Sequence, residues 1–161
     1  MRSAPWWQGT HGEWYVVAQF ILLGLVLAAP WLSPGPAWPA PWSRLAQAVG
    51  ILLILAGGAL AGAGMLGLGR NLSPLPHPKD HAALVETGIY GLVRHPIYSG
   101  LIAGCLGWAL LHNSGLTLLL AAAAFVFFDV KARREERALS ERFPNYRAYQ
   151  QRVRRFIPFI Y

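Results

Sequence analysis

A short segment in the middle of the chain gathers residues that could bind an anionic ligand. It reads Arg94-His95-Pro96-Ile97-Tyr98-Ser99-Gly100. Proline disfavours helix at the residue before it and suits the first helical position, so His95 is expected to be extended and Pro96 to begin a helix. Arg94 and His95 would then lie beside the unpaired N–H groups of a helix start, where a carboxylate or phosphate binds well. Tyr98 would stack one turn further on, and Gly100 would leave room for a flat ring or an alkyl chain.

A second cluster, later in the chain, carries carboxylates. Glu135 and Glu136 lie between Lys131 and Arg137 in a run of charges. Such a run is also typical of a solvated helix with ion pairs three and four residues apart. Adjacent residues diverge by about 100 degrees on a helix, so only one of the two acids is expected to face a site shared with His95. If both clusters lie at one level, the site would suit a zwitterionic ligand.

The elements that must position these clusters are apolar helices. Of the 161 residues, 55% are hydrophobic and 13% are charged, whereas roughly a quarter of an ordinary soluble domain is charged. The sequence predicts an all-α fold, a polytopic membrane helix bundle in one integral membrane domain, residues 1–161. Apolar runs long enough to cross the bilayer, or nearly so, predict four spans, at about 14–32, 45–69, 96–112 and 115–131. The last two are expected to form a hairpin, which would bring Arg94 and Glu135 to the same side of the membrane.

The remaining segments are polar and predict the orientation of the chain. Residues 71–95 carry prolines, histidines and charges that could not face lipid, so we expect them to form a cofactor segment. Residues 132–161 are expected to form a C-terminal helical lid. Basic residues near span ends are retained in the cytoplasm, and this rule places the N- and C-termini there and leaves Arg44 outside. The net charge of +7 comes largely from this C-terminal end, which indicates contact with membrane lipids rather than nucleic acid. No obligate protein partner is inferred.

Other reactive residues favour structural roles. His77 and His81 have the spacing of a metal-binding pair, but Pro78 lies between them and no third ligand is evident, so no metal site is predicted. The single cysteine, Cys105, lies in an apolar run and is expected to serve packing. Four aromatic residues near the C-terminus are consistent with a lid over a ligand, an interfacial belt, or both: Tyr146, Tyr149, Phe156 and Phe159.

The ordered motifs of the second half resemble a known family. They are Leu84-Val85, Gly88, Tyr90, Arg94-His95-Pro96, Tyr98, Gly100, Glu135-Glu136, Tyr146, Tyr149, Val153 and Pro158-Phe159-Ile160. This combination, over about half of the chain, is similar to the isoprenylcysteine carboxyl methyltransferase family. Related motifs occur in phospholipid N-methyltransferases and, more loosely, in membrane sterol reductases that use NADPH.

The resemblance implies that S-adenosyl-L-methionine binds at the cytoplasmic membrane surface, under the C-terminal segment. Its binding residues would be Ala82, Ala83, Leu84, Val85, Tyr90, His95, Pro96, Ile97, Tyr98, Gly100, Glu135 and Glu136. Arg94 and Lys131 would act in catalysis. Lys131 stands where the family tends to have an arginine that meets the substrate, and an ammonium is less suited than a guanidinium to bidentate carboxylate binding.

The expected function is methylation of a carboxylate or an amine on an amphiphilic or lipid-like acceptor. The sequence does not decide between the two acceptor groups. One alternative is a non-catalytic membrane protein or small transporter with the same fold, although the four apolar runs carry no charge near their centres. A second alternative is an NADPH-dependent reductase, for which the sequence offers no glycine-rich dinucleotide motif.

Overall fold

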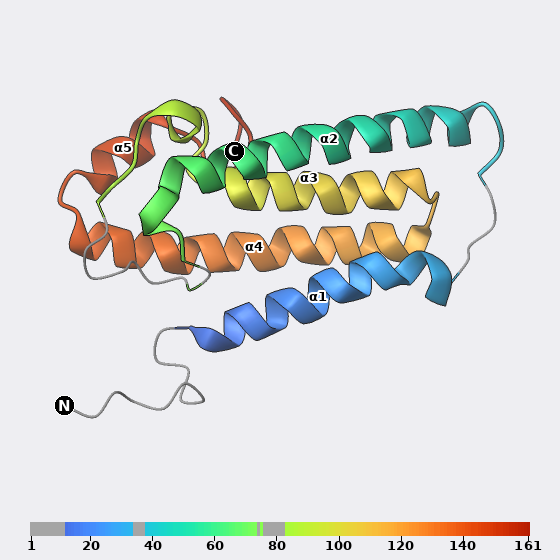
Figure 1. Ribbon diagram of the computed structural model, residues 1–161, viewed down its shortest axis with the longest axis horizontal. Coiled ribbons are helices and arrows are strands. Elements are labelled where there is room, and N and C mark those ends of the chain that lie inside the picture. Colours follow the sequence, from blue (N-terminus) through green and yellow to red (C-terminus); the bar gives the residue numbers. More distant parts are fainter. Residues whose placement is uncertain (1–11, 34–37, 74, 76–82) are drawn as a thin grey trace.

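The fold is a bundle of long helices with a short helix and an irregular segment closing one end (Figure 1). The structure, a computed structural model, describes residues 12–33, 38–73, 75 and 83–161. The helices are α1 Glu13–Leu32, α2 Trp42–Leu68, α3 Pro96–Leu111, α4 Gly115–Arg142 and α5 Tyr146–Arg152, with the 3-10 turns η2 Gly69–Asn71 and η3 Gly88–Gly91. Helix α3 lies between α2 and α4, and α1 runs obliquely along α4 (Figure 1).

Three of these helices are long and apolar enough to cross a membrane: α1, α2 with η2, and α4. Helix α3 is apolar but has only 16 residues, about 24 Å against a hydrocarbon thickness of about 30 Å. Large apolar side chains such as Phe20, Leu52 and Leu119 point away from the bundle and are exposed, as lipid-facing residues are. The predicted all-helical membrane fold is confirmed. The helix bounds agree closely with the expected spans, except that α4 continues beyond residue 131 to Arg142.

Helices α2 and α3 touch through their backbones. A Cβ atom added at Gly57 would lie 2.6 Å from the carbonyl oxygen of Gly100, and one at Gly107 would lie 2.6 Å from that of Gly50. Missing side chains therefore allow the two helices to approach this closely. This contact corrects one expectation. The space beside Gly100 is filled by Gly57 and Ala61 of α2 and is not available to a ligand.

A tight turn makes α3 and α4 antiparallel neighbours, as the predicted hairpin requires. Helix α3 ends at Leu111, and the Ser114 hydroxyl caps α4 by accepting a hydrogen bond from the Thr117 amide at 3.2 Å. The start of α3 and the charged part of α4 consequently lie at the same end of the bundle (Figure 1). The cluster around His95 and the cluster around Glu135 therefore lie close together.

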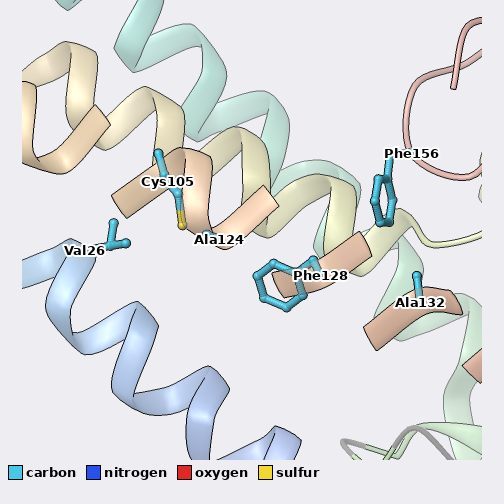
Figure 2. Close-up of a cluster of buried hydrophobic side chains, with 7 residues drawn as sticks. Val26, Cys105, Ala124, Phe128, Ala132 and Phe156 are labelled. Carbon is cyan, nitrogen blue, oxygen red and sulfur yellow. The ribbon is translucent and has the colours of Figure 1, made fainter. Parts of the chain in front are cut away.

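The C-terminal segment returns to this end of the bundle after α5. The amides of Arg94 and His95 donate to the carbonyls of Arg154 and Arg155 at 2.8 and 3.1 Å, and Val93 pairs with Arg154 in a parallel bridge. The next residue, Phe156, is buried in the core. Figure 2 shows this core, with Val26 from α1, Cys105 from α3, and Ala124, Phe128 and Ala132 from α4. Cys105 is buried there and packs as expected.

Candidate active site

A cavity of about 300 Å³ lies at the end of the bundle where α3 begins. Its walls come from the ends of α1 and α2, the segment 83–85, η3, α3, α4 and α5. Ten of the residues predicted from the sequence line it: Ala83, Leu84, Val85, Tyr90, Arg94, His95, Ile97, Tyr98, Lys131 and Glu135. The structure therefore brings most of the predicted residues together around one cavity.

Three predicted residues do not line this cavity. Pro96 begins α3 as expected, but it is buried beside Gly64 of α2. Gly100 lies in the helix contact described above. Glu136 lines a separate cleft instead, since adjacent helical positions diverge by about 100 degrees. Ala82, with His77 and His81, lies outside the described residues.

His95 lies between the two adjacent glutamates. Its Nε2 atom is 3.2 Å from Oε1 of Glu136, and its Nδ1 atom is 3.7 Å from Oε2 of Glu135. The imidazole ring also stacks on Tyr98, at 5.3 Å between ring centroids and 5° between the planes. Both acids therefore reach the imidazole, but only Glu135 is at the cavity surface.

Glu135 is the acid available to a ligand. Its side chain is 28% exposed, against 6% for Glu136. It accepts one short hydrogen bond, from the Tyr98 hydroxyl at 2.8 Å. A carboxylate accepts several hydrogen bonds, so Glu135 keeps capacity for a hydroxyl or an ammonium group.

Glu136 is the centre of a buried ion-pair network. It accepts hydrogen bonds from Arg94 Nε at 3.0 Å and from Arg155 Nη2 at 2.8 Å. Arg94 also donates to the carbonyls of Gln150 and Val153. Burial opposes the charge of Arg155, but its hydrogen bonds and attraction to Glu136 and Asp129 outweigh this and raise its pKa. The network fastens the C-terminal segment to the wall of the cavity.

Lys131 reaches the cavity from within the bundle. Its side chain is buried, its Nζ atom donates to Oε1 of Gln19 at 2.6 Å, and it lies 5.3 Å from the centroid of the Tyr98 ring. Gln19 lines the cavity too and was not predicted. Its only signal in the sequence is an amide within an apolar span, where polar groups are costly unless they find a partner.

Two tyrosines of α5, in the segment expected to form a lid, line the cavity. Tyr146 and Tyr149 line it, and the Tyr149 hydroxyl donates to the Tyr90 carbonyl at 2.6 Å. Burial raises the pKa of Tyr149 and of Tyr90 above the ordinary value, so both phenols keep their protons and donate. Phe156 is instead part of the core, and Phe159 is 88% exposed. The four aromatic residues thus divide between lid, core and surface.

Apolar residues complete the cavity, and no motif in the sequence distinguishes them from other apolar residues of the helices. They are Met65, Leu68, Leu72, Leu75, Leu101, Leu139 and Phe143. Within the described ranges, no group of three or more His, Cys, Asp or Glu residues is placed to hold a metal ion. The site is therefore a cavity with charged groups on part of its wall and hydrocarbon on the rest.

This fold and site define a polytopic membrane helix bundle with a ligand-sized cavity at one end of its helices. The family profile of phospholipid methyltransferases matches residues 45–146, more than half of the chain. The chain therefore belongs to the phospholipid methyltransferase family.

Individual relatives and a solved structure are similar to most of this chain. The cobalt-zinc-cadmium resistance protein CzcN of Cupriavidus metallidurans is 31% identical over 149 residues, covering 91% of this chain and 62% of that protein. The protein-S-isoprenylcysteine O-methyltransferase of Saccharomyces cerevisiae is 33% identical over 123 residues, covering 73% of this chain and 51% of the yeast protein. The structure of the eukaryotic intramembrane Ras methyltransferase ICMT matches with a TM-score of 0.63 and 25% identity, covering 94% of this chain and 54% of that one.

The family profile, the yeast relative and the ICMT structure confirm the resemblance to isoprenylcysteine carboxyl methyltransferases that the motifs indicated. The chain spans less than two thirds of the length of each of these relatives.

Proposed function

We propose that this protein is an S-adenosyl-L-methionine-dependent membrane methyltransferase that acts on an amphiphilic acceptor at the cytoplasmic face. The observation that carries the proposal is the meeting of His95, Tyr98 and Glu135 in one cavity with Lys131 and an apolar wall. A zwitterionic cofactor and an acceptor with an apolar tail require such a mixed lining. Family membership supports the same reaction class.

The residues present fit the cofactor. Glu135 has free acceptor capacity for the ammonium group or the ribose hydroxyls, which form charge-assisted hydrogen bonds with a carboxylate. The backbone N–H groups of Leu84 and Val85 donate to no described residue, and such groups require a partner when they are covered. They are suited to the edge of the adenine ring. When bound, S-adenosylmethionine supplies an electrophilic methyl group on a sulfonium.

The protein's part in the reaction is to hold the reactants in line and exclude water. Tyr146 and Tyr149 close the cavity, while His95 and Tyr98 form a flat wall. Arg94 acts as a positioning residue, because its guanidinium holds Glu136 and the C-terminal carbonyls. Fixed geometry and removal of solvent supply most of the rate for a displacement that needs little acid or base help.

Lys131 favours a carboxylate as the group that is methylated. A buried ammonium attracts an ionised carboxylate and repels a protonated amine, and the attraction is strong where water is excluded. The apolar residues Met65, Leu68 and Leu101 beside it are suited to a hydrocarbon tail. The acceptor would enter sideways from the lipid, with its head at the cytoplasmic level.

The cofactor is tested by calorimetric titration of the detergent-solubilised protein with S-adenosylhomocysteine, beside NADPH. We expect saturable binding of the first and none of the second. Binding of NADPH alone would place the protein among the reductases, and binding of neither would favour a non-catalytic protein.

The acceptor is tested by incubating the protein with a membrane lipid extract and S-adenosylmethionine that carries a labelled methyl group. A methyl ester releases labelled methanol in mild base, whereas an N-methyl group is stable. Base-labile label in the lipid fraction is expected. Label that survives base would show an amine acceptor and contradict the role given to Lys131.

A further inference from the structure

A second cleft lies on the other side of Glu136 from the proposed active site. It has a volume of about 610 Å³ and is formed by α4, α5 and the C-terminal segment. Its charged lining residues are Arg133, Glu136, Arg137, Glu141, Arg147 and Arg155. This second cleft shares no lining residue with the first cavity. The proposed methyl transfer therefore does not use it.

The cleft carries an excess of positive charge. Its carboxylate Glu136 is already bound by Arg94 and Arg155, and the nearby Asp129 is bound by Arg133 and Arg155. Two arginines, Arg137 on α4 and Arg147 on α5, are exposed and form no ion pair with any described residue. Glu141 is the one opposing charge at the rim. Guanidinium groups that line one cleft are suited to phosphate oxygens.

An apolar turn adjoins the cleft. The Tyr161 hydroxyl is 3.1 Å from Nη2 of Arg133 and 3.4 Å from Nη1 of Arg155. Residues 157–161 form a closed turn, in which the amides of Phe156 and Ile157 donate to the Tyr161 carbonyl at 2.7 and 2.9 Å. From this fixed turn Phe159 and Ile160 project, 88% and 75% exposed. A rigid pair of exposed apolar side chains marks contact with another apolar phase.

The depth of both features matches the edge of the bilayer. From Gly115 to Arg133, α4 rises by about 27 Å, close to the hydrocarbon thickness of about 30 Å. Arg133 therefore lies at the headgroup level. The Tyr161 ring is 6.0 Å from the ring of Phe125, which lies within the span. We therefore expect the apolar turn beside the acyl chains and the arginines beside the phosphates.

We propose that this cleft binds the phosphate headgroup of an anionic phospholipid, whose acyl chains lie against the turn formed by residues 157–161. Arg137 and Arg147 contact the phosphate, while Phe159 and Ile160 contact the chains. The lipid at this site is a bound ligand of the protein and is distinct from the acceptor in the first cavity.

The test is native mass spectrometry of the full chain in detergent, titrated with phosphatidylglycerol, with phosphatidylcholine of the same chains as the neutral control. Phosphatidylglycerol should be retained. Because each basic residue at a membrane surface attracts anionic lipid, Arg137→Gln should weaken retention about fivefold, and Arg137→Gln with Arg147→Gln by about twenty-five-fold.

The matched control is Arg134→Gln. Arg134 is also exposed on α4, three residues from Arg137, but its guanidinium lies over the Tyr15 ring, 5.2 Å from the centroid. Arg134→Gln should leave retention of phosphatidylglycerol within about twofold of the parent value. An equal loss in Arg134→Gln and Arg137→Gln would mean that surface charge in general attracts the lipid, and the cleft would then not be a site.

Two further arms distinguish a lipid from a free anion. Phe159→Ser with Ile160→Ser should lower retention of long-chain phosphatidylglycerol, because the acyl contact is lost. Inorganic phosphate should not displace the lipid at equal concentration. If phosphate displaces it, or if the two apolar substitutions have no effect, the cleft is a simple anion site and the proposal is wrong.

Discussion

Two adjacent glutamates have different environments because a helix turns between them. Glu135 faces the cavity with one strong hydrogen bond, whereas Glu136 is enclosed by Arg94, His95 and Arg155. The sequence predicted that the two acids diverge, but it did not decide which one faces the ligand. That choice depends on the rotation of α4, which is set by packing against α1 and α3.

Substitution of each glutamate should therefore give a different result. Glu135→Gln should lower the affinity for S-adenosylhomocysteine about tenfold or more, since hydrogen bonds to charged groups contribute about 1.5–3 kcal/mol. Its thermal unfolding midpoint should change little. Glu136→Gln leaves two guanidinium groups without their carboxylate and should destabilise the fold by about 3 kcal/mol.

Calorimetry and thermal unfolding of the two variants, measured side by side, check this assignment. Equal loss of stability in both, or lost affinity in Glu136→Gln at an unchanged unfolding midpoint, would contradict it.

Lys131 offers a second test at the scale of a residue. Lys131→Met should reduce kcat/KM for a carboxylate acceptor by about tenfold to a hundredfold, because one charged hydrogen bond is lost. The affinity for S-adenosylhomocysteine should stay within about twofold of the parent value. Gln19→Leu, which removes one hydrogen-bond partner of the ammonium, should have a smaller effect in the same direction. A rise in activity in Lys131→Met would show that the ammonium does not contact the acceptor.

At the scale of elements, the helices and the hairpin of α3 and α4 were predictable, and the contacts of the irregular segments were not. Apolar length and the positions of Pro96 and Ser114 are local properties, and they define where α3 and α4 begin. The pairing of Val93 with Arg154 joins two irregular segments far apart in sequence. No periodicity in the sequence predicts this pairing. The prediction that Gly100 leaves room for a ligand was wrong, because a missing side chain leaves space for a ligand and for a neighbouring helix equally well.

The glycines of α2 provide a matched pair for the helix contact. A methyl group at Gly57 would meet the backbone of α3, whereas one at Gly58 would meet nothing within 4 Å. Gly57→Ala should destabilise the protein by about 1–3 kcal/mol through overpacking. Gly58→Ala should be neutral or stabilise it by about 0.5–1 kcal/mol, since alanine favours helix. Thermal unfolding in one detergent compares them, and similar midpoints would mean that α2 and α3 do not pack at this glycine.

At the scale of the whole molecule, the proposed orientation can be measured directly. Arg142 and Arg44 lie near opposite ends of the long helices, and we expect the first in the cytoplasm and the second outside. In a Cys105→Ala background, Arg142→Cys should react with a membrane-impermeant thiol reagent only in inside-out vesicles, and Arg44→Cys only in right-side-out vesicles. The reverse pattern would place the active site on the outer face.

The ion-pair network around Glu136 also has a consequence for how the protein matures. Arg94 is held by carbonyls that follow it by more than fifty residues. This wall of the cavity therefore cannot form until the residues after α4 have been synthesised. The apolar helices and this wall of the cavity are therefore completed at different times. A chain truncated before residue 150 would keep the apolar helices, yet its cavity would lack this wall.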